Sequence, residues 1–228
     1  MGNKALTVAA IVLLFGLQRL VVFLQNGGSL DSFRSIPTQL FSDDDKVRQK
    51  ALARVERLDG AATAELLPVL EAAFGAAEPR KKWYAANAAE KLGPRAAKIA
   101  PRLAKNIKDD EYIVRRSALL ALAAIGPEAY PHIQENLRGI TNDEGEVNVG
   151  LQAIADRYPV EGSRFLVQLM QDESLTRFGY PCMDVLNTQG ENGLNAVREA
   201  ISSTGLQSFA KQSVSVAGNE EMKKLLQQ

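Results

Sequence analysis

Apolar residues recur along most of this chain in copies that start about 33 residues apart. Within a copy they occupy offsets 0, 4, 8 and 11, a spacing that lies on one face of a helix. Copies start at residues 47, 81, 114, 147 and 178, and the second is weaker because Lys81 opens it. Each copy therefore predicts one amphipathic helix. The residues expected to be buried are Val47, Ala51, Val55 and Leu58; Ala85, Ala89 and Leu92; Val114, Ala118, Leu122 and Ile125; Val147, Leu151, Ala155 and Tyr158; and Phe178, Cys182 and Leu186.

A second helix is predicted in each copy. The first helix must stop at offset 12, where four copies have Gly93, Gly126, Pro159 and Gly190, because these residue types end helices. Two further apolar residues then follow at offsets 19 and 23. In the copy at 81 they are displaced by three, which predicts an extra turn around residues 94–97. The pairs are Leu66 and Leu70, Leu103 and Ile107, Ile133 and Leu137, Leu166 and Met170, and Val197 and Ile201.

Five copies of a helix pair predict a repeat architecture. A single pair cannot enclose a core, whereas stacked pairs bury a continuous one. An incomplete sixth copy with Phe209, Ala210 and Val214 ends in the polar residues 220–228, as a C-terminal cap should. We therefore expect an all-α solenoid of about five helix pairs plus a cap over residues 43–228.

Two segments resemble the HEAT repeat, in the short bacterial form named for phycobilisome lyases: residues 45–52 (DKVRQKAL) and 112–127 (YIVRRSALLALAAIGP). The resemblance covers about residues 43–205 and implies a right-handed α-α superhelix with the second helices on its concave side. It also implies that Arg48 and Arg115 join repeats through acidic partners, for which Asp45 and Asp110 are the candidates. It implies little about chemistry, since such repeats serve unrelated functions.

The amino terminus carries a hydrophobic segment before the repeats. Residues 5–24 are apolar except for Thr7, Gln18 and Arg19, and about 20 such residues can span a membrane. We expect residues 1–25 to form a transmembrane anchor or signal-like helix and residues 26–42 to form a linker. A cleaved secretory signal and a helix packed on the solenoid remain as alternatives.

The charges around this segment favour an extracytoplasmic position for the repeats. Lys4 precedes the apolar run, and Arg19 and Arg34 lie at its far end, an asymmetry that weakly places the N-terminus inside. We therefore expect a single-pass membrane protein whose repeats lie in the periplasm.

Composition excludes several kinds of activity. With 27 basic and 27 acidic side chains the chain is neutral, unlike a nucleic-acid-binding domain. The single histidine, His132, and the single cysteine, Cys182, supply no metal cluster or catalytic set, and no glycine-rich phosphate loop is present. Cys182 occupies a core offset and is expected to be inert. The acidic runs at 43–45 and 109–111 are expected to cap helices. The chain is therefore predicted not to be an enzyme and to bind no cofactor.

A polar surface on the second helices is the predicted partner-binding region. Outward positions there are polar, and three of them, Lys105, Lys108 and Arg138, are expected to form a basic cluster. Trp83 and Tyr84 are expected to fill a gap between repeats, with an exposed aromatic anchor as the alternative. The predicted binding residues are Lys105, Lys108, Gln134, Arg138, Gln168 and Gln171.

The leading functional hypothesis is a membrane-anchored, non-enzymatic scaffold that binds a protein partner along the solenoid. The alternative is a lyase-like or chaperone-like factor that assists attachment of a tetrapyrrole, by analogy with the namesake of the repeat. A DNA-binding module is the weakest alternative, because the chain is neutral and begins with an apolar segment.

Overall fold

The computed structural model describes residues 36–140, 144–203 and 205–227. The chain divides into two compact units, residues 1–51 and 52–228. The expected anchor over residues 1–25, and the greater part of the expected linker, lie outside the described residues. Among the helices that the structure describes, none is both long and apolar enough to cross a membrane.

The described part of the first unit consists of a helical turn over residues 36–40 and the beginning of α3 (Asp45–Val55). Asp44 accepts hydrogen bonds from the backbone N–H groups of Lys46 (2.8 Å) and Val47 (3.4 Å), and so caps α3 as expected from the acidic run. Arg48 forms an ion pair with Asp45 and donates to the carbonyl oxygen of Ser42 at 2.8 Å. The predicted pairing of Arg48 with Asp45 is therefore confirmed.

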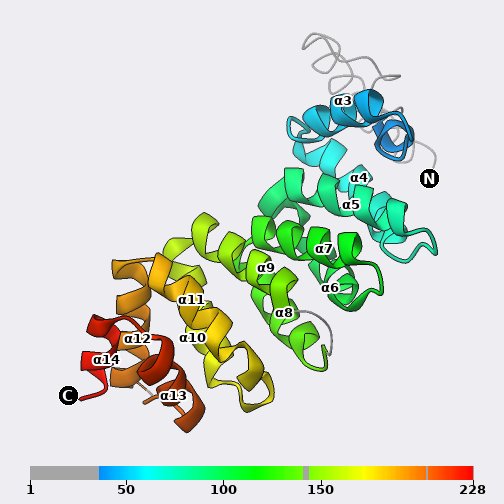
Figure 1. The fold of residues 1–228 in the computed structure, drawn as a ribbon. Helices are drawn as coiled ribbons and strands as arrows, with labels where there is room; N and C mark the ends of the chain where they lie inside the picture. The colour runs from blue at the N-terminus through cyan, green and yellow to red at the C-terminus, as the bar shows by residue number, and fades with distance from the viewer. Residues whose placement is uncertain (1–35, 141–143, 204, 228) are drawn as a thin grey trace, which may run out of the picture. The chain divides into compact units, whose positions relative to one another are not determined.

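The second unit is a succession of helices, with no strand in its described residues (Figure 1). Short 3₁₀ helices (η1 to η4) lie before or after several of the α-helices. In chain order the elements are α4 (Gly60–Ala73), α5 (Pro79–Leu92), η1 (Gly93–Ile99), α6 (Ala100–Ala104), η2 (Lys105–Lys108), α7 (Tyr112–Ile125), η3 (Pro127–Ala129), α8 (Tyr130–Leu137), α9 (Glu144–Arg157), α10 (Pro159–Gln171), η4 (Glu173–Phe178), α11 (Gly179–Thr188), α12 (Glu191–Ser203), α13 (Ser208–Ala217) and α14 (Glu220–Leu225).

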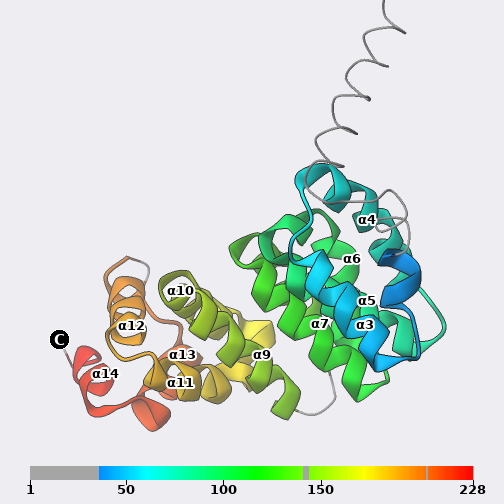
Figure 2. The same ribbon diagram turned by 90° about the horizontal axis from the view of Figure 1, so that it is seen from above.

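These helices pack in two layers (Figures 1 and 2). The first helices contact one another in sequence: α5 with α7, α7 with α9, α9 with α11, and α11 with α13. In the other layer α6 and η2 contact α8, α10 contacts α12, and α12 contacts α14. The rings of Tyr130 in α8 and Phe165 in α10 stack with centroids 4.4 Å apart. The second unit is therefore an all-α solenoid of helix pairs, and the predicted fold class is confirmed at that level.

The apolar offsets identify the core. Along α7 all four predicted residues, Val114, Ala118, Leu122 and Ile125, are at most 2% exposed, and each fully buried aliphatic side chain contributes about 1.5–3 kcal/mol. The stripes of α5 and α11 and nearly all of the second-helix pairs are likewise buried. The exceptions are half-buried and lie at the ends of their patterns: Val47, Leu58, Tyr158 and Ile201.

The predicted helix stops occur where expected. Gly93, Gly126 and Gly190 have φ values of 58°, 92° and 55°, in the left-handed region that side chains with a Cβ rarely adopt. At Gly126 a Cβ would also come 2.5 Å from the ring of Tyr158. The Tyr158 hydroxyl donates to the carbonyl oxygen of Ala124 at 3.2 Å. The bare Gly126 backbone thus lets Tyr158 reach across to the end of the preceding first helix.

The displaced pair in the second copy has a visible cause. Residues 93–99 form the 3₁₀ helix η1 between α5 and α6, so the extra turn predicted around residues 94–97 is present and is a tight one. The side chain of Arg95 in η1 donates to the carbonyl oxygens of Glu56 (2.9 Å) and Leu92 (3.2 Å) and to that of Leu58. These three bonds satisfy carbonyl groups left over at helix ends.

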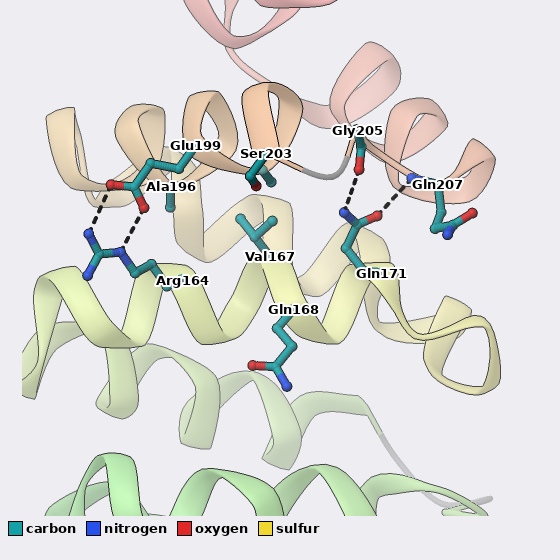
Figure 3. A pocket seen from close by; sticks show the side chains of 10 residues that line it. Arg164, Val167, Gln168, Gln171, Ala196, Glu199, Ser203, Gly205 and Gln207 are labelled. Atoms are coloured by element: carbon teal, nitrogen blue, oxygen red, sulfur yellow. Dashed lines mark hydrogen bonds and ion pairs between the residues drawn. The ribbon is translucent and has the colours of Figure 1, made fainter.

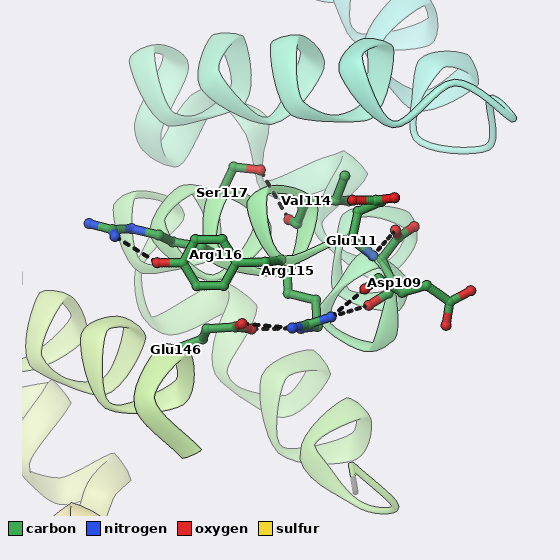
Figure 4. Close-up of polar contacts among 9 residues, drawn as sticks. Asp109, Glu111, Val114, Arg115, Arg116, Ser117 and Glu146 are labelled. Atoms are coloured by element: carbon green, nitrogen blue, oxygen red, sulfur yellow. Dashed lines mark hydrogen bonds and ion pairs between the residues drawn. The ribbon is translucent and has the colours of Figure 1, made fainter. Parts of the chain in front are cut away.

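Arg115 joins two repeats, but its predicted carboxylate partner was wrong (Figure 4). Its guanidinium makes a bidentate contact with the Glu146 carboxylate near the start of α9. Nε lies 2.6 Å from Oε2, and Nη2 lies 2.7 Å from Oε1. Asp110 contributes only its backbone carbonyl oxygen, at 2.7 Å, and Asp109 does the same at 2.9 Å. The Asp110 side chain is exposed, whereas Glu146 belongs to the next repeat and completes the joint.

The remaining single residues fall where the pattern placed them. Cys182 is fully buried, and burial raises the pKa of its thiol. Tyr84 is buried and Trp83 half-buried, with ring centroids 4.9 Å apart, which favours the packing interpretation over an exposed anchor for Tyr84. The acidic run at 109–111 is an exception, because Glu111 at the N-cap of α7 makes no side-chain cap hydrogen bond. The Asp109 carboxylate instead accepts from the Glu111 backbone N–H at 3.1 Å and pairs with Lys82 of α5 at 2.6 Å.

Candidate functional site

The exposed and half-buried polar side chains of the second helices form the candidate site, which we call the second-helix face. The helices that carry it are η1 to η2, α8, α10 and α12. Its members at the C-terminal half of the solenoid come from successive repeats and contact one another. We define it by the residues Lys98, Arg102, Lys105 and Lys108; Gln134, Glu135 and Arg138; Arg164, Gln168 and Gln171; and Arg198 and Glu199.

Two of the predicted binding residues converge on a side chain that the sequence analysis missed, and a third is joined to them. Asp172, directly after α10, accepts from Gln134 Nε2 at 2.8 Å and from Arg138 Nη2 at 2.6 Å. Gln168 Nε2 donates to Gln134 Oε1 at 3.0 Å, which extends the chain of hydrogen bonds from α10 back to α8. The Ser174 hydroxyl and then Arg138 hold the pKa of the Asp172 carboxyl well below its usual range.

Gln171 reaches the following repeat instead. Its Nε2 donates to the carbonyl oxygen of Gly205 at 2.9 Å, and its Oε1 accepts from the backbone N–H of Gln207 at 2.7 Å (Figure 3). One side-chain amide therefore pairs with both a backbone donor and a backbone acceptor of the non-helical segment before α13. This is the pairing that a glutamine on a helix surface offers to any exposed peptide backbone.

A groove of 440 Å³ lies between α10 and α12 (Figure 3). Val167 points from α10 toward α12, whereas Gln168 points to the other side of α10. Arg164 and Glu199 bridge the groove at one end, with Nε to Oε2 at 2.7 Å and Nη2 to Oε1 at 2.9 Å. This contact raises the pKa of Arg164 and lowers that of Glu199. The groove is lined by Arg164, Val167, Gln168, Gln171, Ala196, Glu199, Ala200, Ser203, Gly205 and Gln207.

Lys105 and Lys108 lie apart from these hydrogen bonds, on η2, and both are exposed. The ion pair with Asp172 occupies Arg138, so Arg138 does not extend the predicted cluster as a third unpaired cation. The structure therefore groups the six predicted residues differently. Gln134 and Arg138 meet at Asp172, and Gln168 bonds to Gln134. Gln171 lies at the groove, and the two lysines belong to a separate surface.

A second hollow, of 480 Å³, lies where the first helices end, between residues of α5, α7 and α9. Arg157 of α9 reaches past the end of α7 to pair with Glu90 of α5 at 2.7 Å, and Glu56 and Lys91 line the same hollow. Arg157 and Tyr158 in its lining contact neighbouring repeats, which fits a role in stacking.

The described residues hold no group of three or more His, Cys, Asp or Glu side chains placed to bind a metal ion. His132 is half-buried in α8, and the Cys182 thiol is buried in the core. The second-helix face offers hydrogen-bonding and charge-pairing groups.

No protein-family model matches the chain, and no curated protein is detectably similar to it in sequence. Several solved structures are similar in shape. An engineered protein (structural genomics target OR366) has 19% sequence identity and a TM-score of 0.42, with 84% of this chain and 98% of that one covered. A designed armadillo repeat protein, YIII(Dq)4CqI, has 18% identity and a TM-score of 0.40, with 85% and 96% covered. The fold assignment rests on the helix packing described above, and the HEAT resemblance stays a prediction.

Proposed function

We propose that this chain is a non-enzymatic scaffold that binds an extended protein segment along the second-helix face. The observation that carries the proposal is the groove between α10 and α12, with Val167, Ala196 and Ala200 among its lining residues and Gln and Ser side chains at its edges. Its 440 Å³ falls within the usual range of about 300–1,000 Å³ for binding pockets. An apolar lining with a few polar groups accepts a side chain and fixes its orientation.

The contacts of Gln171 indicate how such a segment would be held. Its amide already pairs with the backbone at Gly205 and Gln207. Gln168 lies one turn earlier and is exposed, but its amide points to the other side of α10 and donates to Gln134. Because a side-chain amide can donate and accept at once, a glutamine beside the groove can pair with a partner's backbone whatever the partner's side chains are.

We further propose that the apolar residues before the solenoid tether it to a membrane with the repeats on the extracytoplasmic side. This part of the proposal rests on sequence alone. Protease accessibility tests it in intact cells and in spheroplasts that lack the outer membrane but keep the inner membrane intact. Repeats protected only in intact cells support an extracytoplasmic position, whereas repeats protected equally in both contradict it.

The test of the scaffold function is cross-linked co-purification from solubilised membranes with the full chain. Ala200→Trp would fill the groove, because Ala200 is half-buried in its wall. Ala53→Trp is the matched control, on an exposed position of α3. We expect a near-stoichiometric partner with the native chain and the control, and its loss with Ala200→Trp. Retention of the same partner by Ala200→Trp would contradict the groove as the binding site.

A chain that lacks residues 1–28 separates recognition from tethering. Recovery of the partner with this shorter chain supports binding by the repeats, whereas recovery with the full chain alone would place recognition in the first residues. The alternative of a tetrapyrrole attachment factor is tested by adding a bilin or haem and measuring the absorption spectrum; an unshifted band counts against it.

A further inference from the structure

One strip of the second-helix face is purely cationic, and the groove does not include it. Along η1, α6 and η2 the exposed charged positions include Lys98, Arg102, Lys105 and Lys108, whereas the positions between them are largely buried, with Ile99, Leu103 and Ile107 at 2% exposure or less. Residues three and four apart lie on one side of a helix. The four cations therefore form a single line, which we call the basic strip.

None of the four cations pairs with a carboxylate among the residues that the structure describes. Elsewhere in the second unit such pairs are common, and they connect α5 to the loop before α7 (Lys82 with Asp109), α7 to α9 (Arg115 with Glu146) and α10 to α12 (Arg164 with Glu199). Like charges three or four residues apart destabilise a helix. An unpaired line of them therefore has a cost that a bound anion would remove.

The surroundings of the strip decide which anion fits. The neighbouring second helices carry exposed carboxylates, Glu65 and Glu71 on α4 and Glu135 on α8, and Asp110 and Glu111 follow the strip directly. A flat anionic membrane would approach these carboxylates together with the cations, and like charges repel. A narrow anionic chain laid along the strip would avoid them.

The dimensions fit an extended peptide. The ten residue steps from Lys98 to Lys108, at about 1.5 to 2.0 Å each, span roughly 15–20 Å. An extended peptide covers this length with about five or six residues, and its alternate side chains, which point the same way, are about 6.6 Å apart. One helical turn advances about 5.4 to 6 Å, so carboxylates at every second residue come close to matching successive cations.

We propose that the basic strip binds an acidic, extended protein segment with carboxylates at alternate positions. The inference rests on the proposed scaffold function and names the chemistry of its partner: the acidic part of the segment lies on η1 to η2, and a further part reaches the groove at α10 and α12.

The probe is a dye-labelled peptide of alternating Glu and Ser, about ten residues long, titrated with the full chain at low salt and followed by fluorescence anisotropy. The same peptide with Gln in place of Glu measures the contribution of charge. We expect the acidic peptide to bind, the Gln peptide to bind at least about tenfold more weakly, and rising salt to weaken the acidic complex, because exposed charge pairs are screened.

The variant carries Lys98→Glu, Arg102→Glu, Lys105→Glu and Lys108→Glu. The chain offers a matched control with the same residue types: Arg57→Glu, Lys91→Glu, Lys211→Glu and Lys224→Glu, at four exposed cations without an ion pair among the described residues. Both variants change the net charge equally. We expect the strip variant to lose at least about tenfold in affinity and the control to lose less than about threefold. If the strip variant is not folded by circular dichroism, Lys105→Glu with Lys108→Glu replaces it, against Lys91→Glu with Lys211→Glu.

Three results would overturn the proposal: equal losses in the two variants, no binding of the acidic peptide at low salt, or strip-dependent binding to phosphatidylglycerol vesicles in place of the peptide, which would make the ligand a lipid surface. The scaffold function and the acidic class of partner can fail independently of each other. If Ala200→Trp abolishes co-purification of the partner while the strip variant retains it, the scaffold stands and the acidic class of partner is wrong.

Discussion

Two arginine–glutamate joints connect repeats of this solenoid with nearly the same geometry but in different surroundings. Arg115 and Glu146 join α7 to α9 in the first layer, and Arg164 and Glu199 join α10 to α12 in the second. In both joints the guanidinium makes a bidentate contact with the carboxylate. The side chains of the first pair are 12% and 6% exposed, and those of the second are 54% and 53% exposed.

This difference in exposure predicts that the two joints differ in how much they stabilise the fold. A buried charge that loses its partner is left without water, whereas an exposed charge is rehydrated at little cost. Arg115 is also held by two backbone carbonyl oxygens, so it fixes the loop before α7 as well as the next repeat. The Arg164 joint costs little to open, and it lies at the edge of the groove, where a partner could take over either charge.

Removing the buried arginine should have the largest effect. Arg115→Ala leaves the Glu146 carboxylate buried and unpaired, and we expect the free energy of unfolding to fall by about 3–5 kcal/mol. Urea denaturation followed by circular dichroism measures it. Arg115→Met combined with Glu146→Leu should recover most of this loss, because it removes both charges. A cost for Arg115→Ala no greater than that for Arg164→Ala would refute the comparison.

An intermediate effect is expected at Asp172, whose side chain is 13% exposed and pairs with Arg138. We expect Asp172→Asn to cost about 1.5–3 kcal/mol at neutral pH, as for hydrogen bonds to charged groups. The folded-state pKa of Asp172 is lowered, so its contribution is present above the unfolded pKa of about 3.9 and is lost as the pH falls below it.

The stability difference between native chain and Asp172→Asn should therefore shrink from pH 7 to pH 3.5. Asp156→Asn is the control, since Asp156 is exposed and accepts hydrogen bonds from two glutamine amides. A difference for Asp172→Asn that stays constant over this pH range would mean that its charge is not what stabilises the fold.

The smallest effect is expected at the exposed joint. Arg164→Ala should lower the free energy of unfolding far less than Arg115→Ala or Asp172→Asn does, because exposed ion pairs contribute little to stability, and the change should diminish in high salt. The same denaturation experiment at two salt concentrations measures it. A cost that is large and insensitive to salt would show that the second layer is held together like the first.

The sequence predicts the layers well because burial repeats with the helical period. Ala118 and Cys182 occupy the same offset in different copies, and both are fully buried. The stop at Gly126 could be predicted from residue type alone, because few other residues adopt a φ of 92°.

Contacts between repeats could not be predicted in the same way. Asp110 lies five residues from Arg115 and was the obvious candidate, whereas Glu146 is 31 residues away, and only the stacking of α9 on α7 brings it close. Asp172 was missed for the same reason, since its partner Arg138 lies 34 residues away. A comparison of each copy's helix ends with the polar residues of the preceding copy would have found both.

The buried thiol of Cys182 makes local opening of the last repeats measurable in the native chain. It is the only cysteine, it is fully buried in α11, and only the thiolate reacts with alkylating reagents. Stacked repeats can open from an end while the rest stays folded. The rate at which Cys182 is alkylated under native conditions therefore counts how often the last repeats, α11 to α14, come away from the stack.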